Sequence, residues 1–239
     1  MKKILTTLVA SCLTVAAFAQ GTVNWTGVAG FFNGQTNGTA FSPFVSSAGA
    51  TLSGTLGNTL GNNTANNALL GYTGYYYALL TSASAVAPTT IAGLQALGIT
   101  GLTATNGAAS NGRIIQVAGT TARSASGWAL GGSTNVVLVG WSGNIGTTFA
   151  AALGNLQNWA AFSQTLTQPA FFGLSSVGTL TSGTADPGVV VFGASAGQIN
   201  NGSAAPEQLL QLGAPVPEPG TMALAALGGA SLLLFRRKK

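Results

Sequence analysis

The sequence predicts a mainly β fold: a Gly/Asn-rich β-sandwich with one packed amphipathic helix at about residues 147–162. Three observations predict it. Many short apolar segments of strand character are separated by turns rich in Gly and Asn. One of them, Asn135 to Trp141, is apolar throughout, as expected of a central strand covered on both faces. Only one segment shows a clear helical spacing of apolar residues.

The first half of the chain supplies two strands around a long loop. Thr22 to Phe32 is predicted to be a strand with a Gly interruption, and residues 33–67 a low-complexity loop. Tyr72 to Ser82 is a second strand because aromatic and β-branched residues favour strands. Its alternation places Tyr75, Tyr77 and Leu79 on one face and Tyr76, Ala78 and Leu80 on the other. Thr89 to Leu97 is predicted to form one or two helical turns.

The second half holds the predicted helix and the remaining strands. Arg113 to Val117 and Asn135 to Trp141 are predicted strands. Thr147 or Thr148 can cap the helix with its hydroxyl. Apolar residues then recur every three or four positions, at Phe149, Leu153, Leu156 and Trp159 or Ala160. The remaining predictions are strands at Ala170–Leu174, Val177–Thr181 and Val189–Phe192, a turn at Asp186–Gly188, and a final helical turn at Glu207–Leu212.

The N-terminus has the three parts of a secretory signal peptide. Met1-Lys2-Lys3 is a short positive region, Ile4 to Ala17 is apolar, and Ala17-Phe18-Ala19 is a small-x-small cleavage site. We therefore expect residues 1–19 to be removed by signal peptidase before Gln20. An alternative is a lipoprotein in which Cys12 is acylated, since Val9-Ala10-Ser11-Cys12 fits a lipobox. The apolar run before Cys12 is short for that reading.

The C-terminus has a second set of targeting features. Val216-Pro217-Glu218-Pro219 precedes an apolar segment at 220–235, and Arg236-Arg237-Lys238-Lys239 follows it. As a helix that segment would be about 24 Å long at 1.5 Å per residue, a marginal membrane span. The four cations would hold the end of the chain on the cytoplasmic side. Because the two prolines disfavour helix, the motif should be extended and accessible at the membrane surface.

These C-terminal features resemble the PEP-CTERM sorting signal of bacterial exported proteins. The resemblance covers Val216 to Lys239, within a predicted sorting tail at 214–239. It implies that an exosortase-like enzyme in the membrane recognises Pro217-Glu218-Pro219 and removes the tail. The protein would be anchored transiently in the inner membrane and then lie at the cell surface or outside the cell. The pattern from Tyr72 onward also resembles PEP-CTERM proteins of the planctomycete and verrucomicrobial kind, which have no assigned chemistry. Residues 20–213 would be the exported domain.

Composition excludes several functions of that domain. The formal net charge of +5 comes from the two ends of the chain. Between residues 20 and 215 the charged residues are Arg113, Arg123, Asp186 and Glu207, with a net charge of zero. Nucleic-acid binding needs several cations on one face, so we expect none. We also expect no metal site and no cofactor, because this part of the chain contains no His or Cys and only two scattered carboxylates.

The exported part also lacks the partners that catalysis needs. Gly193 to Gly197 matches the G-x-S-x-G pattern of a hydrolase nucleophile, but Ser195 has no histidine or lysine to take its proton. Asp186 and Glu207 are far apart in sequence, and nothing local pairs them for glycoside hydrolysis. We therefore expect a non-enzymatic envelope or extracellular-matrix protein, with a hydrolase as the remote alternative.

One alternative is a polysaccharide-binding module of the exopolysaccharide matrix, in which exposed aromatic rings stack on sugars. The opposing interpretation is that these rings fill the core. The candidates are Trp25, Tyr72, Tyr75, Tyr76, Tyr77, Trp128, Trp141 and Trp159.

Overall fold

The computed structural model describes residues 20–24, 34–44, 58–59, 74–106, 114–116, 122–183, 188–200 and 207–212. Within them the protein is mainly β, as predicted, with three short α-helices. The strands are β1 (Gln20–Asn24), β2 (Gly34–Phe41), β3 (Asn58–Thr59), β4 (Tyr75–Ser82), β5 (Gly98–Asn106), β6 (Ile114–Gln116), β7 (Ala122–Ala129), β8 (Ser133–Ser142), β9 (Ala170–Leu174), β10 (Gly178–Thr181), β11 (Val189–Val190) and β12 (Glu207–Leu212). The helices are α3 (Ile91–Gln95), α4 (Phe149–Gln157) and α5 (Trp159–Phe162), with 3₁₀ turns η1 (Gly143–Ile145) and η2 (Ser163–Thr165).

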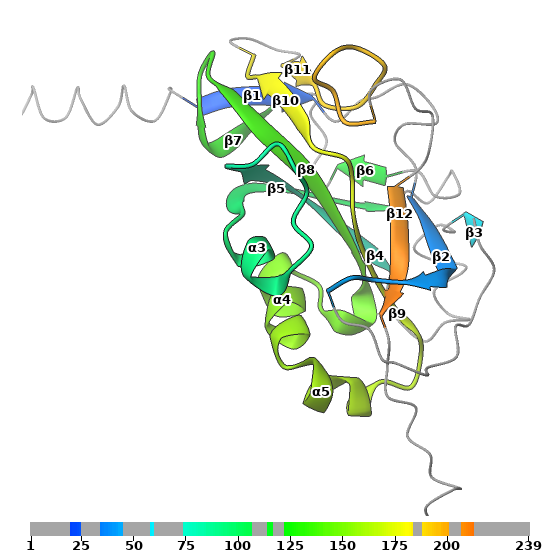
Figure 1. Cartoon of the computed structure of the whole chain (residues 1–239). Coiled ribbons are helices and arrows are strands. Elements are labelled where there is room, and N and C mark those ends of the chain that lie inside the picture. The colour runs from blue at the N-terminus through cyan, green and yellow to red at the C-terminus, as the bar shows by residue number, and fades with distance from the viewer. Residues whose placement is uncertain are drawn as a thin grey trace, which may run out of the picture.

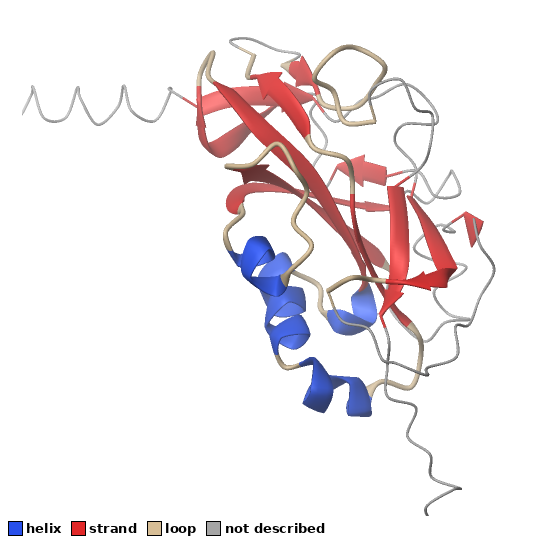
Figure 2. Ribbon diagram, viewed as in Figure 1, coloured by secondary structure: helices blue, strands red, loops and turns tan. Residues whose placement is uncertain are grey.

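The described strands form two sheets that pack on each other (Figure 1). The small sheet has the order β11-β1-β7. The large sheet has the order β3-β2-β12-β9-β8-β4-β5-β6, with β10 pairing β8 outside this path. The helices cover the other face of the large sheet (Figure 2). The large sheet is therefore the middle of three layers.

The alternating side chains of β4 and β8 fill the two cores on either side of the large sheet. Tyr75, Tyr77 and Leu79 join Val136 and Leu138 in the core shared with the small sheet. Ala78 and Leu80 of β4 and Val137, Val139 and Trp141 of β8 belong to the core under the helices. The faces predicted for Tyr75 to Leu80 are confirmed, as is the central, doubly covered position of β8.

The predicted helix exists but is divided in two. Thr148 is its N-cap, and its hydroxyl accepts a hydrogen bond of 3.2 Å from the Ala151 N–H. Asn158, with φ −106° and ψ 29°, separates α4 from α5. Leu156 and Trp159 still face the sheet across this break. The short helix α3 confirms the helical turns expected between Thr89 and Leu97.

Two predictions of local structure were wrong. Glu207–Leu212 is not a helical turn but strand β12, which pairs in parallel with β2 and antiparallel with β9. Residues 33–67 are not wholly loop, because they contain β2 and β3. In both cases pairing with a neighbouring strand satisfies the backbone and overrides weak local preference.

The other strand predictions agree with the structure within the residues it describes. Arg113–Val117 contains β6, Ala170–Leu174 is β9, and Val177–Thr181 contains β10. Strand β11 is shorter than predicted, with Phe192 making only an isolated bridge to Ile199. Residues 25–32 of the first predicted strand lie outside the described residues. Strands β5 and β7 were not predicted.

Among the described helices, none is both long and apolar enough to cross a membrane. Residues 220–235, for which the sequence predicts a span, lie outside the described part of the chain. The limits of the signal peptide and of the sorting tail stay predictions.

Candidate functional site

Strand β12 ties the end of the described chain into the middle of the large sheet. It lies between β2 and β9, with Leu210 opposite Phe172 and Leu212 opposite Ala170. The side chains of Leu209 and Leu212 are fully buried, on opposite faces of the sheet. In Figure 1, β12 (orange) ends beside β9, at the end of the molecule where α5 lies. We call this end, formed by residues 159–169 and the last residues of β12, the β12 end.

A buried polar contact braces the β12 end. The Phe171 N–H donates to the Ser142 hydroxyl over 2.8 Å, and that hydroxyl donates to Asn144 Oδ1 over 2.7 Å. Asn144 Nδ2 lies 3.1 Å from the carbonyl oxygen of Pro169 and 3.3 Å from that of Gln168. The 3₁₀ turn after β8 is thereby fastened to the loop that leads into β9, which is the strand paired with β12.

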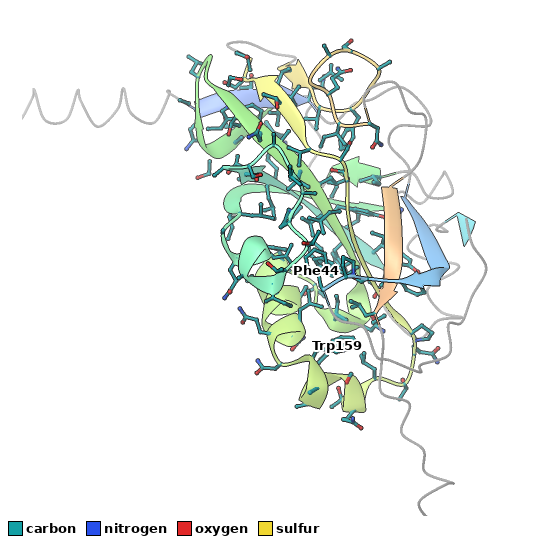
Figure 3. All side chains as sticks on the ribbon, in the orientation of Figure 1. Phe44 and Trp159 are labelled. Carbon is teal, nitrogen blue, oxygen red and sulfur yellow. The ribbon has the colours of Figure 1, made fainter. Side chains whose placement is uncertain are left out.

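Aromatic packing holds the same region from the helix side. The rings of Phe44 and Phe172 meet edge to face with centroids 5.2 Å apart. Trp141 packs between Tyr76 and Phe149, and its indole N–H donates to the Gly146 carbonyl over 2.8 Å. Figure 3 marks Phe44 and Trp159, which both pack against the core under the helices. The strands around the end of β12 are therefore held by hydrogen bonds and by aromatic packing.

Removing the Ser142 hydroxyl should weaken the polar contact at the β12 end and destabilise the fold. Ser142→Ala leaves the buried Phe171 N–H without its acceptor and is expected to lower the free energy of unfolding by about 1–3 kcal/mol. Ser126→Ala, at an exposed position of β7, is the control and should change it by less than about 0.5 kcal/mol. Urea unfolding of both variants measures the difference. Equal stability of the two variants would show that the brace contributes nothing.

The predicted targeting residues lie mostly outside the described residues. This holds for the sorting motif Val216-Pro217-Glu218-Pro219, for the cations Arg236 to Lys239, and for Ala17 and Ala19. Gln20, the predicted first residue after cleavage, is exposed and begins β1, where it pairs with Ala129. Strand β1 is the central strand of the small sheet, so the domain's first strand begins directly at the expected cleavage site.

Ser195 lies in an exposed turn that is closed by a neighbouring glutamine. The Ser195 N–H donates to Gln198 Oε1 over 2.9 Å, and the Gln198 N–H returns a bond of 3.1 Å to the Ser195 carbonyl. Gln198 Nε2 also reaches the Val190 carbonyl over 3.1 Å. A nucleophile elbow requires a strand, a sharp turn and a helix. The described residues after Ser195, as far as Asn200, form a turn and a bridge instead.

The candidate sugar-stacking aromatics are mainly core residues. Tyr75, Tyr77, Trp128, Trp141 and Trp159 are all less than 9% exposed. Tyr76 is half-buried, and its ring is stacked on Trp141 with centroids 6.3 Å apart. Trp25 and Tyr72 lie outside the described residues. The six described rings therefore do not form an exposed surface on which a sugar could stack.

The charged candidates are not brought together among the described residues. Glu207 begins β12, whereas Asp186 lies outside the described part of the chain. Within the described ranges, no cluster of three or more His, Cys, Asp or Glu residues could hold a metal ion. Sequence reasoning missed the Ser142–Asn144 brace, because its partners are 24 to 29 positions further along the chain. The only local signal was a pair of polar residues directly after an apolar strand.

Comparison with protein families identifies the C-terminal tail. The PEP-CTERM protein-sorting motif matches residues 215–238. The match begins three positions after Leu212, the last residue of β12. This motif implies an exported protein that is anchored through its C-terminus and processed by an exosortase at the cell surface. Comparisons with curated proteins and with solved structures found no match.

Proposed function

We propose that the protein is a non-enzymatic component of the bacterial cell envelope or extracellular matrix, delivered by its sorting tail. The observation that carries the proposal is the PEP-CTERM motif, which follows directly on a strand integrated into the sheet. The domain would be exported whole, held briefly at the inner membrane, and released to the cell surface or medium. Its sequence pattern fits the planctomycete or verrucomicrobial kind of PEP-CTERM protein.

The chemistry of the domain supports a structural role. It has no histidine, and its four charged residues between positions 20 and 215 cancel. A surface with so little charge is poorly soluble on its own, which suits a protein that is embedded in a matrix. Ser195 has no base among the residues of its turn. The polysaccharide-binding alternative now depends on Trp25 and Tyr72, because the other candidate rings lie in or against the core.

Replacing Pro217-Glu218-Pro219 with three alanines tests the proposal. We expect the variant to keep its tail and to stay in the membrane fraction, because the exosortase no longer recognises an extended Pro-Glu-Pro segment. The measurement is the mass and location of the mature chain. Pro215→Ala, a proline of the same tail outside the tripeptide, is the matched control and should mature normally. Unchanged maturation of the triple variant would refute sorting through this motif.

A further inference from the structure

The tail connects to the domain through a short tether. Seven residues, 213–219, separate Leu212 at the end of β12 from the apolar segment that starts at Gly220. Fully extended, the eight steps from Leu212 to Gly220 span at most about 26–29 Å at 3.3–3.6 Å per residue. Leu212 itself is fixed, because it pairs with Ala170 and its side chain is fully buried. The membrane is therefore always within this distance of the β12 end while the tail is inserted.

The domain is longer than this tether. Strand β8 has 10 residues, which extend over about 30 Å. Its C-terminal end lies beside the β12 end, since Trp141 and Leu210 both pair with Phe172. At its other end, the β7–β8 turn contains Leu130, which is 44% exposed. Turning this end to the membrane would require the tether to run back along the sheet at or beyond its full extension.

The surface of the β12 end is suited to lipid headgroups. Residues 159–169 contain no charged residue, so contact with the headgroups desolvates no ion. Gln164, Thr165 and Thr167 are exposed and can exchange hydrogen bonds with headgroup oxygens, whereas Phe162 and Leu166 are half-buried against the core. The Asn144 bonds to the carbonyl oxygens of Gln168 and Pro169 hold this surface in place.

We infer that the β12 end is a docking surface for the lipid headgroups of the membrane while the tail is inserted. The β7–β8 turn then points away from the membrane. This inference rests on the proposed function of the tail as a membrane anchor, and it adds an orientation of the folded domain.

Two fluorescent labels test this orientation. The one cysteine of the chain, Cys12, lies in the predicted signal peptide, so the chain from Gln20 to Lys239 allows clean labelling at Thr167→Cys on the β12 end and at Leu130→Cys on the opposite end. Both positions are exposed. The exported form with its tail, from Gln20 to Lys239, is placed in phosphatidylcholine–phosphatidylglycerol vesicles that carry a headgroup quencher, because the apolar residues 4–17 would otherwise insert beside Gln20 and Ala129. We expect several-fold stronger quenching at position 167 than at position 130. Inserting about twenty Gly and Ser residues after Gly213 should abolish that difference, because a flexible tether frees the domain.

The outcomes separate the docking from the anchoring. Equal quenching at the two positions on chains that float with the vesicles overturns the docking surface alone. Quenching at position 167 that requires membranes containing the exosortase also overturns it, because the enzyme and not the lipid would then be the occupant. Chains that do not float with the vesicles overturn the anchoring function of the tail, and the docking with it.

Discussion

Replacing Trp141 with alanine is expected to lower the free energy of unfolding by about 3–5 kcal/mol. The side chain is only 1% exposed and packs between Tyr76 and Phe149, with ring centroids 6.3 Å and 6.0 Å away. Its loss leaves a cavity between β8 and the helices and removes the donor to the Gly146 carbonyl. Urea or guanidinium unfolding of the exported domain measures the change.

Two further variants make this result specific. Trp141→Phe keeps most of the packing but loses the indole N–H, so it should cost much less than the alanine variant, with about 1 kcal/mol from the lost hydrogen bond. Val86→Ala, at a position that is 73% exposed, should stay within about 0.5 kcal/mol of the unchanged protein. An alanine variant of Trp141 as stable as the Val86 variant would mean that the helices do not pack on the large sheet in this way.

Leu209→Ala is expected to cost about 2–5 kcal/mol, because it empties the main contact between β12 and the core shared by the two sheets. Leu209 is fully buried and lies over Gly140 of β8. A Cβ atom at Gly140 would come within 2.7 Å of Leu209 Cδ2 and 2.8 Å of the Tyr77 ring. The glycine therefore leaves room for the Leu209 side chain and the Tyr77 ring, and Gly140→Ala should be destabilising by itself because both neighbours are fully buried.

A double-mutant cycle tests that contact directly. In the Leu209→Ala background, a Cβ atom at position 140 no longer meets Leu209 Cδ2, so the cost of Gly140→Ala should be smaller than in the unchanged protein. We expect a coupling energy well above the roughly 0.5 kcal/mol seen for independent sites. Leu130→Ala, at an exposed position, serves as the control partner and should not couple with Gly140. Additive costs at positions 140 and 209 would contradict the contact of the Leu209 side chain with Gly140.

Sequence reasoning predicted the elements whose local pattern is strong. The apolar alternation of β4, the continuous apolar run of β8 and the Thr148 cap of α4 all follow from their own residues. Strand β12 was mistaken for a helical turn because Glu-Gln-Leu-Leu-Gln-Leu has no clear period of two, and its state is decided by the neighbouring β2 and β9. Strand β2 was missed because its Gly, Asn and Thr residues are typical of loops.

Some features of the candidate site could likewise be predicted from the sequence and others could not. The sorting motif was predictable because an enzyme reads it as a linear segment, and the family comparison matches it. The Ser142–Asn144 brace could not be predicted from the sequence. Its partners at Gln168, Pro169 and Phe171 contact it only in the folded sheet. The aromatic residues were ambiguous in sequence, since the same rings can fill a core or bind a sugar. The described ones lie in or against the core.

The mass of the mature protein, taken from the cell surface or the medium, is the most direct test of delivery through the tail. We predict a chain that begins at Gln20, keeps β12 through Leu212, and lacks the apolar segment and the cations Arg236 to Lys239. Such a form carries every described strand of both sheets. A mature protein that retains the complete tail, or one cut before Glu207 so that β12 is lost, would contradict delivery through the tail.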